Sequence, residues 1–351
     1  MKGFLRFIGT TLLTLLRVGV WPVVAGLVFV FSLTLVALTF SGPAALGDGA
    51  DPGRMARSFV VYLVLAAVML GVPAVLANAR TEIGQQSFLR TFGVALSVGL
   101  SFIIVAIPSI IVSAILGGVD FGQWIPIVAL TKLETWVIAA LTALAFSNVR
   151  RDGAAAITAF GLVAGLAIAP LFVVASASFG PTVTQTVRTL YLDYGNGNQV
   201  IDPVTGFPMH PTCSPGGNQI KTVTRYDAVW PALELNPFVL VSGASTPAFS
   251  TVDNVDDPYA ATSVEPVDVF GTVDLAVRRM QLPIETDVTI DECANLAQYG
   301  TPYPSGYDGT YAPQYVVDHT TSGLGVGLIG QGAYLAVASA ALVLIGRRSR
   351  R

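Results

Sequence analysis

Six apolar segments constrain the fold of this chain more than any other feature of its sequence. Each holds about 20 or more residues with few charges, the length that an α-helix needs to cross the hydrocarbon core of a bilayer. They lie at 18–40, 59–79, 92–116, 125–148, 154–178 and 324–346. The whole chain has 53% hydrophobic and only 12% charged residues, far from the composition of soluble domains. We therefore predict a polytopic α-helical membrane protein with six transmembrane helices.

A polar, acidic segment, residues 179–323, separates the fifth apolar segment from the sixth. It holds 16 acidic and five basic residues, whereas the other 206 residues hold six acidic and 14 basic ones. Lysine and arginine near short loops are retained on the cytoplasmic side. With the N-terminus inside, this rule accounts for 11 of the 14 cations, and the exceptions are Arg54, Arg57 and Lys132. We expect a multi-pass protein of the cell membrane with both termini cytoplasmic and residues 179–323 outside the cytoplasm.

The chain is thus expected to divide into four regions. Residues 1–17 are cut by Lys2, Arg6 and Arg17 into apolar stretches too short to span, which favours an amphipathic helix lying among the lipids of the membrane interface. A cleaved signal peptide is the alternative for this stretch. The other regions are a five-helix transmembrane region at 18–178, an extracytoplasmic domain at 179–323, and a sixth transmembrane helix with a basic cytoplasmic tail at 324–351.

Both cysteines of the chain, Cys213 and Cys293, lie in the acidic segment. Two cysteines in an oxidising compartment, and none elsewhere, predict a disulfide, with two free thiols as the alternative. Residues 184–192 and 219–224 alternate as strands do, and residues 268–280 have helical spacing. We expect a small α+β domain between the fifth and sixth transmembrane helices.

Motifs of catalysis and nucleotide binding are missing from this sequence. None of the three lysines stands in a phosphate-binding loop, and there is no H-E-x-x-H, no G-x-S-x-G and no zinc-type cysteine pair. The cations do not form a basic patch with aromatic residues, so nucleic acid is not an expected partner. Asp253, Asp256 and Asp257 offer oxygen ligands for calcium, but a solvated acidic loop is the favoured interpretation. We expect neither an enzyme nor a metal protein.

Two ionisable residues, Lys132 and Glu134, interrupt the fourth apolar segment. Ionisable groups at membrane depth usually face a bundle interior or a water-filled cavity, so they are candidates for a translocation pathway. Two positions apart on a helix, they point to nearly opposite sides and cannot be partners of one another. The alternative places them close enough to the outer interface for Lys132 to reach the headgroups.

The connector at residues 80–91 is expected in the cytoplasm and is too short to form a domain. A helix there would offer Ile83 and Phe88 to a partner, with Arg80, Glu82 and Arg90 available for polar contacts. We interpret it as a candidate docking surface, and a solvated loop is the alternative.

Three stretches of the chain resemble the ABC-2 type permease subunits of bacterial ABC transporters, especially the actinobacterial branch. Residues 141–160, LTALAFSNVRRDGAAAITAF, are similar to the family's small-residue helix, double-arginine turn and alanine-rich restart. Residues 230–243, WPALELNPFVLVSG, resemble a motif in which an aromatic lead-in precedes N-P-F-V. Residues 268–293 resemble a helix with paired basic residues ahead of a cysteine. With six spans and a large outer loop before the last, the resemblance covers most of the chain.

The resemblance implies a permease, leaning toward export, that forms a dimer with a second copy or a homologue. It also implies a cytosolic P-loop ATPase subunit as partner, which would bind the ATP and Mg²⁺ that this chain does not bind. Residues 80–91 then match the family's coupling region, and the expected ATPase-coupling residues are Arg80, Glu82, Ile83, Gly84, Phe88 and Arg90. The alternative function is a non-transporting membrane scaffold that presents an extracytoplasmic binding domain to an envelope partner.

Overall fold

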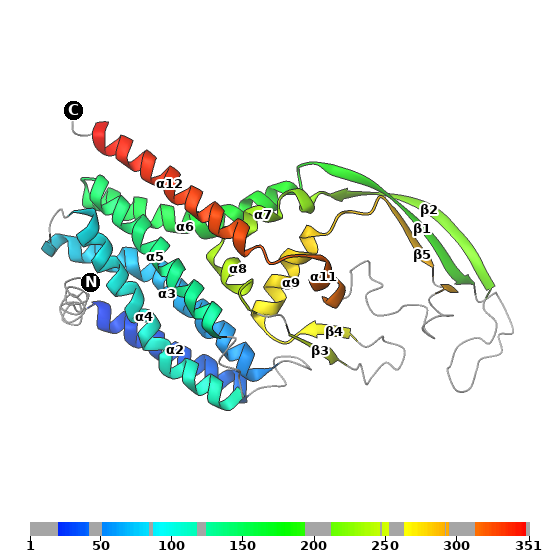
Figure 1. Cartoon of the computed structure of the whole chain (residues 1–351), viewed down its shortest axis with the longest axis horizontal. Coiled ribbons are helices and arrows are strands. Elements are labelled where there is room, and N and C mark those ends of the chain that lie inside the picture. The colour runs from blue at the N-terminus through cyan, green and yellow to red at the C-terminus, as the bar shows by residue number, and fades with distance from the viewer. Residues whose placement is uncertain are drawn as a thin grey trace.

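The computed structural model describes residues 20–41, 51–83, 87–117, 124–193, 212–245, 248–252, 263–291, 293–294 and 313–348. Within these ranges six long helices form one bundle, and a smaller region of strands and short helices extends from one end of it (Figure 1). The expected interfacial helix at 1–17 and the acidic loop at 253–257 lie outside the described residues.

The six long helices are the expected spans. Each is long and apolar enough to cross a membrane. They are α2 (Val20–Ser41), α3 (Pro52–Ile83), α4 (Phe88–Gly117), α5 (Trp124–Asn148), α6 (Asp152–Ala177) and α12 (Leu324–Arg348). This architecture confirms the expected six long apolar helices, and it is consistent with a polytopic membrane protein.

The helix α3 is longer at both ends than its apolar segment predicted. It begins at Pro52, where proline suits the first helical position, and Asp51 caps it by accepting from the backbone N–H groups of Gly53 (2.8 Å) and Arg54 (3.1 Å). A cap of this kind starts a helix ahead of the hydrophobic stretch, and hydropathy alone does not show it. At its other end α3 runs on to Ile83, into the expected connector.

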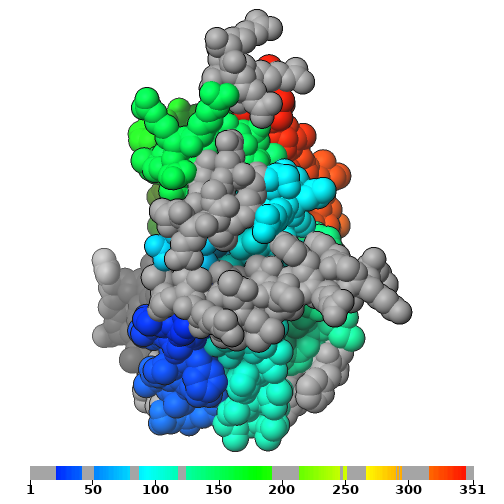
Figure 2. All heavy atoms as spheres, turned by 90° about the vertical axis from the view of Figure 1, so that its left-hand side faces the viewer, coloured from blue at the N-terminus to red at the C-terminus, as the bar shows by residue number. Residues whose placement is uncertain are grey.

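The bundle interior is apolar, with short polar links between helices. Val60, Phe102, Ile138 and Leu166 are among its fully buried members. The Trp21 indole N–H donates to the Ser101 hydroxyl (3.1 Å), joining α2 to α4. Viewed from the end opposite the strands, α2 and α12 lie on opposite sides of the bundle (Figure 2).

The outer surface of the bundle carries many large apolar side chains. Ile115, Ile157, Phe172 and Val337 are each at least 70% exposed. Such a surface would be unfavourable in water, because soluble proteins rarely expose large contiguous apolar patches. It suits contact with lipid tails, as the membrane assignment requires.

The described residues between α6 and α12 form two small sheets and five short helices. Strands β1 (Thr182–Asp193) and β2 (Thr212–Thr224) are antiparallel, and β5 (Asp287–Asp291) joins β1 in parallel to give the order β2-β1-β5. Strands β3 (Phe249–Val252) and β4 (Ser263–Pro266) form a second pair. The short helices are η3 (Tyr226–Ala228), α7 (Trp230–Leu233), α8 (Pro237–Ser242), α9 (Val269–Gln281) and α11 (Pro313–His319). This small α/β region fits the expected mixture of strands and helices.

Cys213 and Cys293 form a disulfide, as the sequence predicted. Their Cα atoms are 6.1 Å apart, and 80 positions separate them in the sequence. The bond ties the start of β2 to the residues that follow β5. On the chain-entropy model, closing a loop of this size stabilises the folded state by about 4 kcal/mol.

Candidate functional site

Part of the segment expected to form the extracytoplasmic domain packs into the helix bundle. We call residues 230–242, which comprise α7, α8 and the three residues between them, the wedge. The Asn236 side chain donates from Nδ2 to the backbone oxygen of Ala167 in α6 (2.7 Å). Ala167 lies ten residues before the end of α6, which is about 15 Å along a helix. The wedge therefore reaches far below the end of the bundle from which the strands extend.

The sequence of the wedge explains its shape. Asn236 caps α8, because its Oδ1 accepts from the backbone N–H of Phe238 (2.9 Å), and Pro237 occupies the first helical turn. Phe238 packs against the core of the bundle, and Leu240 is fully buried. An asparagine cap followed by a short apolar helix lets polar backbone enter a bundle, since its groups stay bonded to protein.

Glycines in α12 and at the residue just before it make room for the wedge. A Cβ atom at Gly327 would collide with the backbone oxygen of Glu234 and with Leu240. At Gly330 it would lie 3.0 Å from the Leu235 side chain, and at Gly323 it would overlap the Glu234 carboxylate. The close approach of α12 to the wedge thus depends on these three positions lacking side chains.

The Glu134 carboxylate is buried where α5, α12 and the wedge meet. Glu134 has no exposed surface, and neither carboxylate oxygen has a hydrogen-bond partner. Gln331 of α12, which is also buried, lies beside it and donates from Nε2 to the backbone oxygen of Leu235 in the wedge (3.2 Å). Lys132, the other candidate of this segment, is exposed on the opposite side of α5. The structure therefore separates the two sequence candidates, as their spacing indicated.

The polar groups around the wedge lie at similar depth. Glu134 is ten residues after the start of α5, and Gln331 is seven after the start of α12. At 1.5 Å per residue these positions are about 10–15 Å from the helix ends nearest the strands. The hydrocarbon core of a bilayer is about 30 Å thick. The Glu134 carboxylate, the Gln331 amide and the Asn236 amide thus gather near the middle of the bundle.

A second carboxylate, Glu234, lies in the wedge against the first residues of α12. It is 3% exposed, and its Oε2 has no hydrogen-bond partner. Burial raises the pKa of Glu234 to about 7, the charge of Asp274 adds to that rise, and Arg278 partly offsets it. This carboxyl therefore titrates close to neutral pH.

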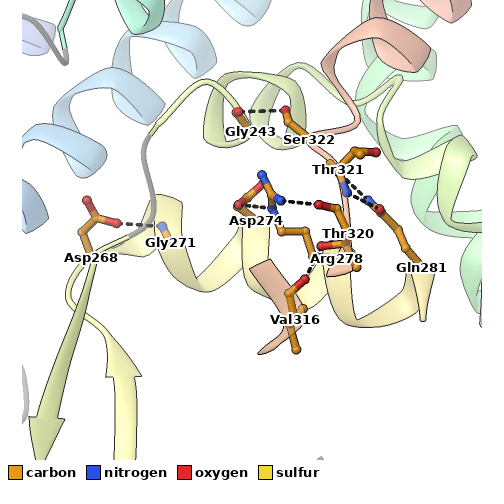
Figure 3. Close-up of polar contacts among 10 residues, drawn as sticks. All are labelled: Gly243, Asp268, Gly271, Asp274, Arg278, Gln281, Val316, Thr320, Thr321 and Ser322. Carbon is orange, nitrogen blue, oxygen red and sulfur yellow. Dashed lines mark hydrogen bonds and ion pairs between the residues drawn. The ribbon is translucent and has the colours of Figure 1, made fainter. Parts of the chain in front are cut away.

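A set of polar contacts, which we call the latch, joins α9 to the residues that lead into α12 (Figure 3). Arg278 and Asp274 form a buried ion pair (Nε to Oδ2, 2.7 Å), and Arg278 also donates to the backbone oxygen of Thr320. Gln281 exchanges two hydrogen bonds with the backbone of Thr321. Ser322 donates to the backbone oxygen of Gly243, just after α8. The latch holds α8, α9 and the start of α12 as one unit.

Aromatic contacts attach this unit to α3. The Tyr62 ring meets Phe238 and Phe270 edge-on, with centroid distances of 5.3 and 5.1 Å, and the Tyr62 hydroxyl is hydrogen-bonded to Ser242. Nearby, the buried Arg57 guanidinium lies over the Trp124 ring at 5.0 Å. Arg57 did not fit the charge rule for topology, and this contact gives it a place inside the bundle.

The expected ATPase-coupling residues lie at the far end of the bundle from the strands. Arg80, Glu82 and Ile83 belong to the last turn of α3, while Phe88 and Arg90 belong to the first turn of α4, where both are exposed. The connector is therefore formed by the ends of two long helices, and Gly84 lies outside the described residues. Their role in coupling stays a prediction.

Three residues of the site were not identified as candidates from the sequence: Glu234, Asn236 and Gln331. The Asn-Pro step of the wedge was visible, but nothing in the sequence gave its depth. Gln331 is a single amide in a long apolar segment, and such a residue changes hydropathy little. Its isolation was the signal that could have marked it, because polar side chains within spans tend to bond across helices.

Comparison of the chain with protein-family models, curated proteins and solved structures found no match. Among the described residues, no group of three or more histidine, cysteine, aspartate or glutamate side chains is placed to hold a metal ion. What the site does provide is a set of acceptor oxygens near mid-membrane depth, beside a segment that enters the bundle from one end.

Proposed function

We propose that this chain is the transmembrane permease subunit of an exporting ABC transporter, powered by a separate ATP-binding subunit. The observation that carries the proposal is the buried Glu134 carboxylate, which lies where the wedge meets α5 and α12. Ionisable groups within spans are costly and usually belong to a transport pathway or a proton relay. A scaffold whose helices only anchor an outer domain has no need of such a group.

The wedge supports the same proposal, because its movement would expose buried polar groups in the interior of the bundle. Short broken helices at mid-membrane depth occur in transporters, where they line the substrate site. Here Asn236 and Leu235 hold the wedge to α6 and α12 through one side-chain hydrogen bond each. Withdrawal of the wedge would break these two bonds and the Tyr62–Ser242 hydrogen bond, and would uncover Glu134.

Coupling to ATP hydrolysis is proposed at the opposite end of the bundle. The exposed Phe88 and Arg90 stand at the start of α4, next to the end of α3. A cytosolic P-loop ATPase, carrying ATP and Mg²⁺, would dock there and move the ends of these helices. A second copy of the chain or a homologue would complete the membrane part, packing through the apolar bundle surface that is otherwise covered by lipid.

Co-purification tests this function. The full chain, carrying an affinity tag, is extracted in mild detergent from the membranes of its own host, and the recovered proteins are identified by mass spectrometry. We expect a P-loop ATPase in the complex, with ATP turnover that depends on the tagged chain. A stable, functional complex that contains no ATPase would contradict the proposal.

One observation favours the scaffold as a second candidate. Strands β1 and β2 extend away from the bundle (Figure 1), and Ile220 (76%) and Tyr191 (42%) are exposed on them. Such a hairpin offers a surface to an envelope partner. Replacing 184–222 by a short turn, with Cys293→Ser to avoid an unpaired thiol, separates the candidates while the wedge is kept. A permease retains its ATPase, whereas a scaffold loses its partner.

A further inference from the structure

We propose that Glu134 and Gln331 form an intramembrane proton-binding site, in which Glu134 is protonated while the wedge is seated between α5 and α12. The proton is thereby a ligand of the bundle itself, in addition to whatever substrate a permease would carry. This would hold for a bundle of this structure whether or not an ATPase drives it.

The Glu134 and Gln331 side chains bring buried acceptor oxygens together. Both oxygens of Glu134 and Oε1 of Gln331 are buried acceptors with no donor. The Gln331 Nε2 group donates to the backbone oxygen of Leu235 in the wedge, and the Gln331 side chain lies beside the Glu134 carboxylate. An ionised carboxylate only accepts, whereas a protonated one also donates. A proton on Glu134 supplies the donor that this group of acceptors lacks.

Among the described residues, no side chain offers Glu134 a counter-charge. Helix α5 packs against α3, α4, α6, α8 and α12, and the polar side chain beside the Glu134 carboxylate is the neutral amide of Gln331. Among the described side chains of these elements and of the wedge, the ionisable groups form no ion pair with Glu134. They are Arg54, Arg57 and Tyr62 on α3, Arg90 on α4, Asp152 on α6, Glu234 in the wedge and Tyr334 on α12. A buried carboxylate without a partner takes up a proton, since burial opposes its charge.

The buried site favours a ligand as small as a proton. Glu134 has no exposed surface. A metal cation would need several oxygen ligands around it, and the described residues form no group of three or more histidine, cysteine, aspartate or glutamate side chains that could hold one. A proton is the one positive ligand that needs no further space and no further ligand.

Release of the proton follows from the contacts of the wedge. When the wedge withdraws, Gln331 loses its bond to Leu235 and water reaches Glu134. The O–H bond of the carboxylic acid then breaks, the proton passes to water, and the carboxylate accepts a hydrogen bond from the freed Gln331 amide. Seating the wedge reverses these steps. Withdrawal of the wedge would thus release one proton to water, and seating would take one up.

Infrared spectroscopy of the purified full chain in lipid nanodiscs, without any ATPase, tests the site. The carbonyl stretch of a protonated carboxylic acid lies apart from that of a carboxylate. The comparison is made in a Glu234→Gln background near neutral pH, because Glu234 itself titrates there. We expect this band to fall by the absorbance of one carboxylic acid in the Glu134→Gln variant, and to stay unchanged in Lys132→Gln.

Two further measurements keep the test decisive. Glu134→Asp retains the carboxylic acid on a shorter side chain. Its contribution to the carbonyl band should therefore change frequency while the total absorbance stays the same. This variant serves as the test if Glu134→Gln does not fold. Replacing Na⁺ by choline should leave the band unchanged. Equal bands in all variants would show that Glu134 is ionised, and loss of the band in Na⁺ would show a cation in place of the proton. Either result would overturn the site, and neither bears on co-purification with an ATPase.

Discussion

The buried carboxyl group of Glu234 is expected to make the stability of this protein depend on pH. Burial raises the pKa of Glu234 from 4.5 to about 7, so the folded chain holds this proton more tightly than the unfolded chain. The contribution of Glu234 to stability is therefore complete below about pH 4.5 and is lost as the pH rises through about 7. A difference of this size corresponds to about 3 kcal/mol of unfolding free energy.

We predict that Glu234→Gln removes most of this pH dependence. The glutamine is neutral at every pH, so it avoids the cost of burying a charge between the wedge and α12. Thermal unfolding of the detergent-solubilised chain should show less loss of Tm between acid and mildly alkaline pH than in the wild type. Glu285→Gln, at an exposed position, is the control. Parallel pH curves for Glu234→Gln and the wild type would contradict the assignment.

The sequence predicted some of these residues and not others, for physical reasons. Glu134 was a candidate because a charge within an apolar segment is conspicuous, and its two-residue offset from Lys132 placed the two on opposite sides. Glu234 lies in a segment that is acidic overall, so its burial could not be read from composition. Gln331 gave no charge signal at all. Glu134, Glu234 and Gln331 are buried by elements that lie far apart in the sequence, namely α5, the wedge and α12.

At the scale of elements, the wedge is the feature that the sequence did not predict. Its two helices have four and six residues, too short for a hydropathy or periodicity signal, whereas the six spans are long and strongly apolar. The wedge is placed by tertiary contacts, chiefly Asn236 with α6 and the glycines of α12. Helix α9, which has clear amphipathic spacing, was predicted close to its observed bounds.

Gly327→Ala should destabilise the seating of the wedge by about 1–3 kcal/mol, because the new methyl group collides with buried atoms of the wedge. The expected result is a lower Tm and faster proteolysis within residues 230–242. Gly332→Ala is the matched control on the same helix, since a Cβ atom there meets nothing within 4 Å. Equal Tm values for the two variants would refute the proposed packing.

At the scale of the whole molecule, the bundle and the sheet β2-β1-β5 are stabilised by separate means. The latch and Tyr62 hold α8 and α9 to the bundle, whereas the disulfide acts on β2 and the residues after β5. The positions of the spans and the disulfide followed from the sequence, because both depend on local composition and residue type. The boundary between the bundle and the outer region did not follow from the sequence, because the wedge comes from the outer segment and packs inside the bundle.

Replacing both cysteines by serine should therefore loosen the sheet and leave the bundle folded. We expect the loss to approach the chain-entropy value of about 4 kcal/mol, and to be confined to β1, β2 and β5. Limited proteolysis should cut the strands faster, with 230–242 as protected as in the wild type. Exposure of the wedge in this variant would show that the sheet helps to seat it.

The central claim is that ATP hydrolysis at one end of the bundle is coupled to the wedge within it. The most direct test is the ATP turnover of the partner ATPase in lipid vesicles, measured without this chain, with the wild type, and with Gly327→Ala or Gly332→Ala. We predict that the chain raises turnover several-fold, that Gly327→Ala alters this stimulation, and that Gly332→Ala does not. Turnover that is the same with and without the chain, or the same with both variants as with the wild type, would contradict the claim.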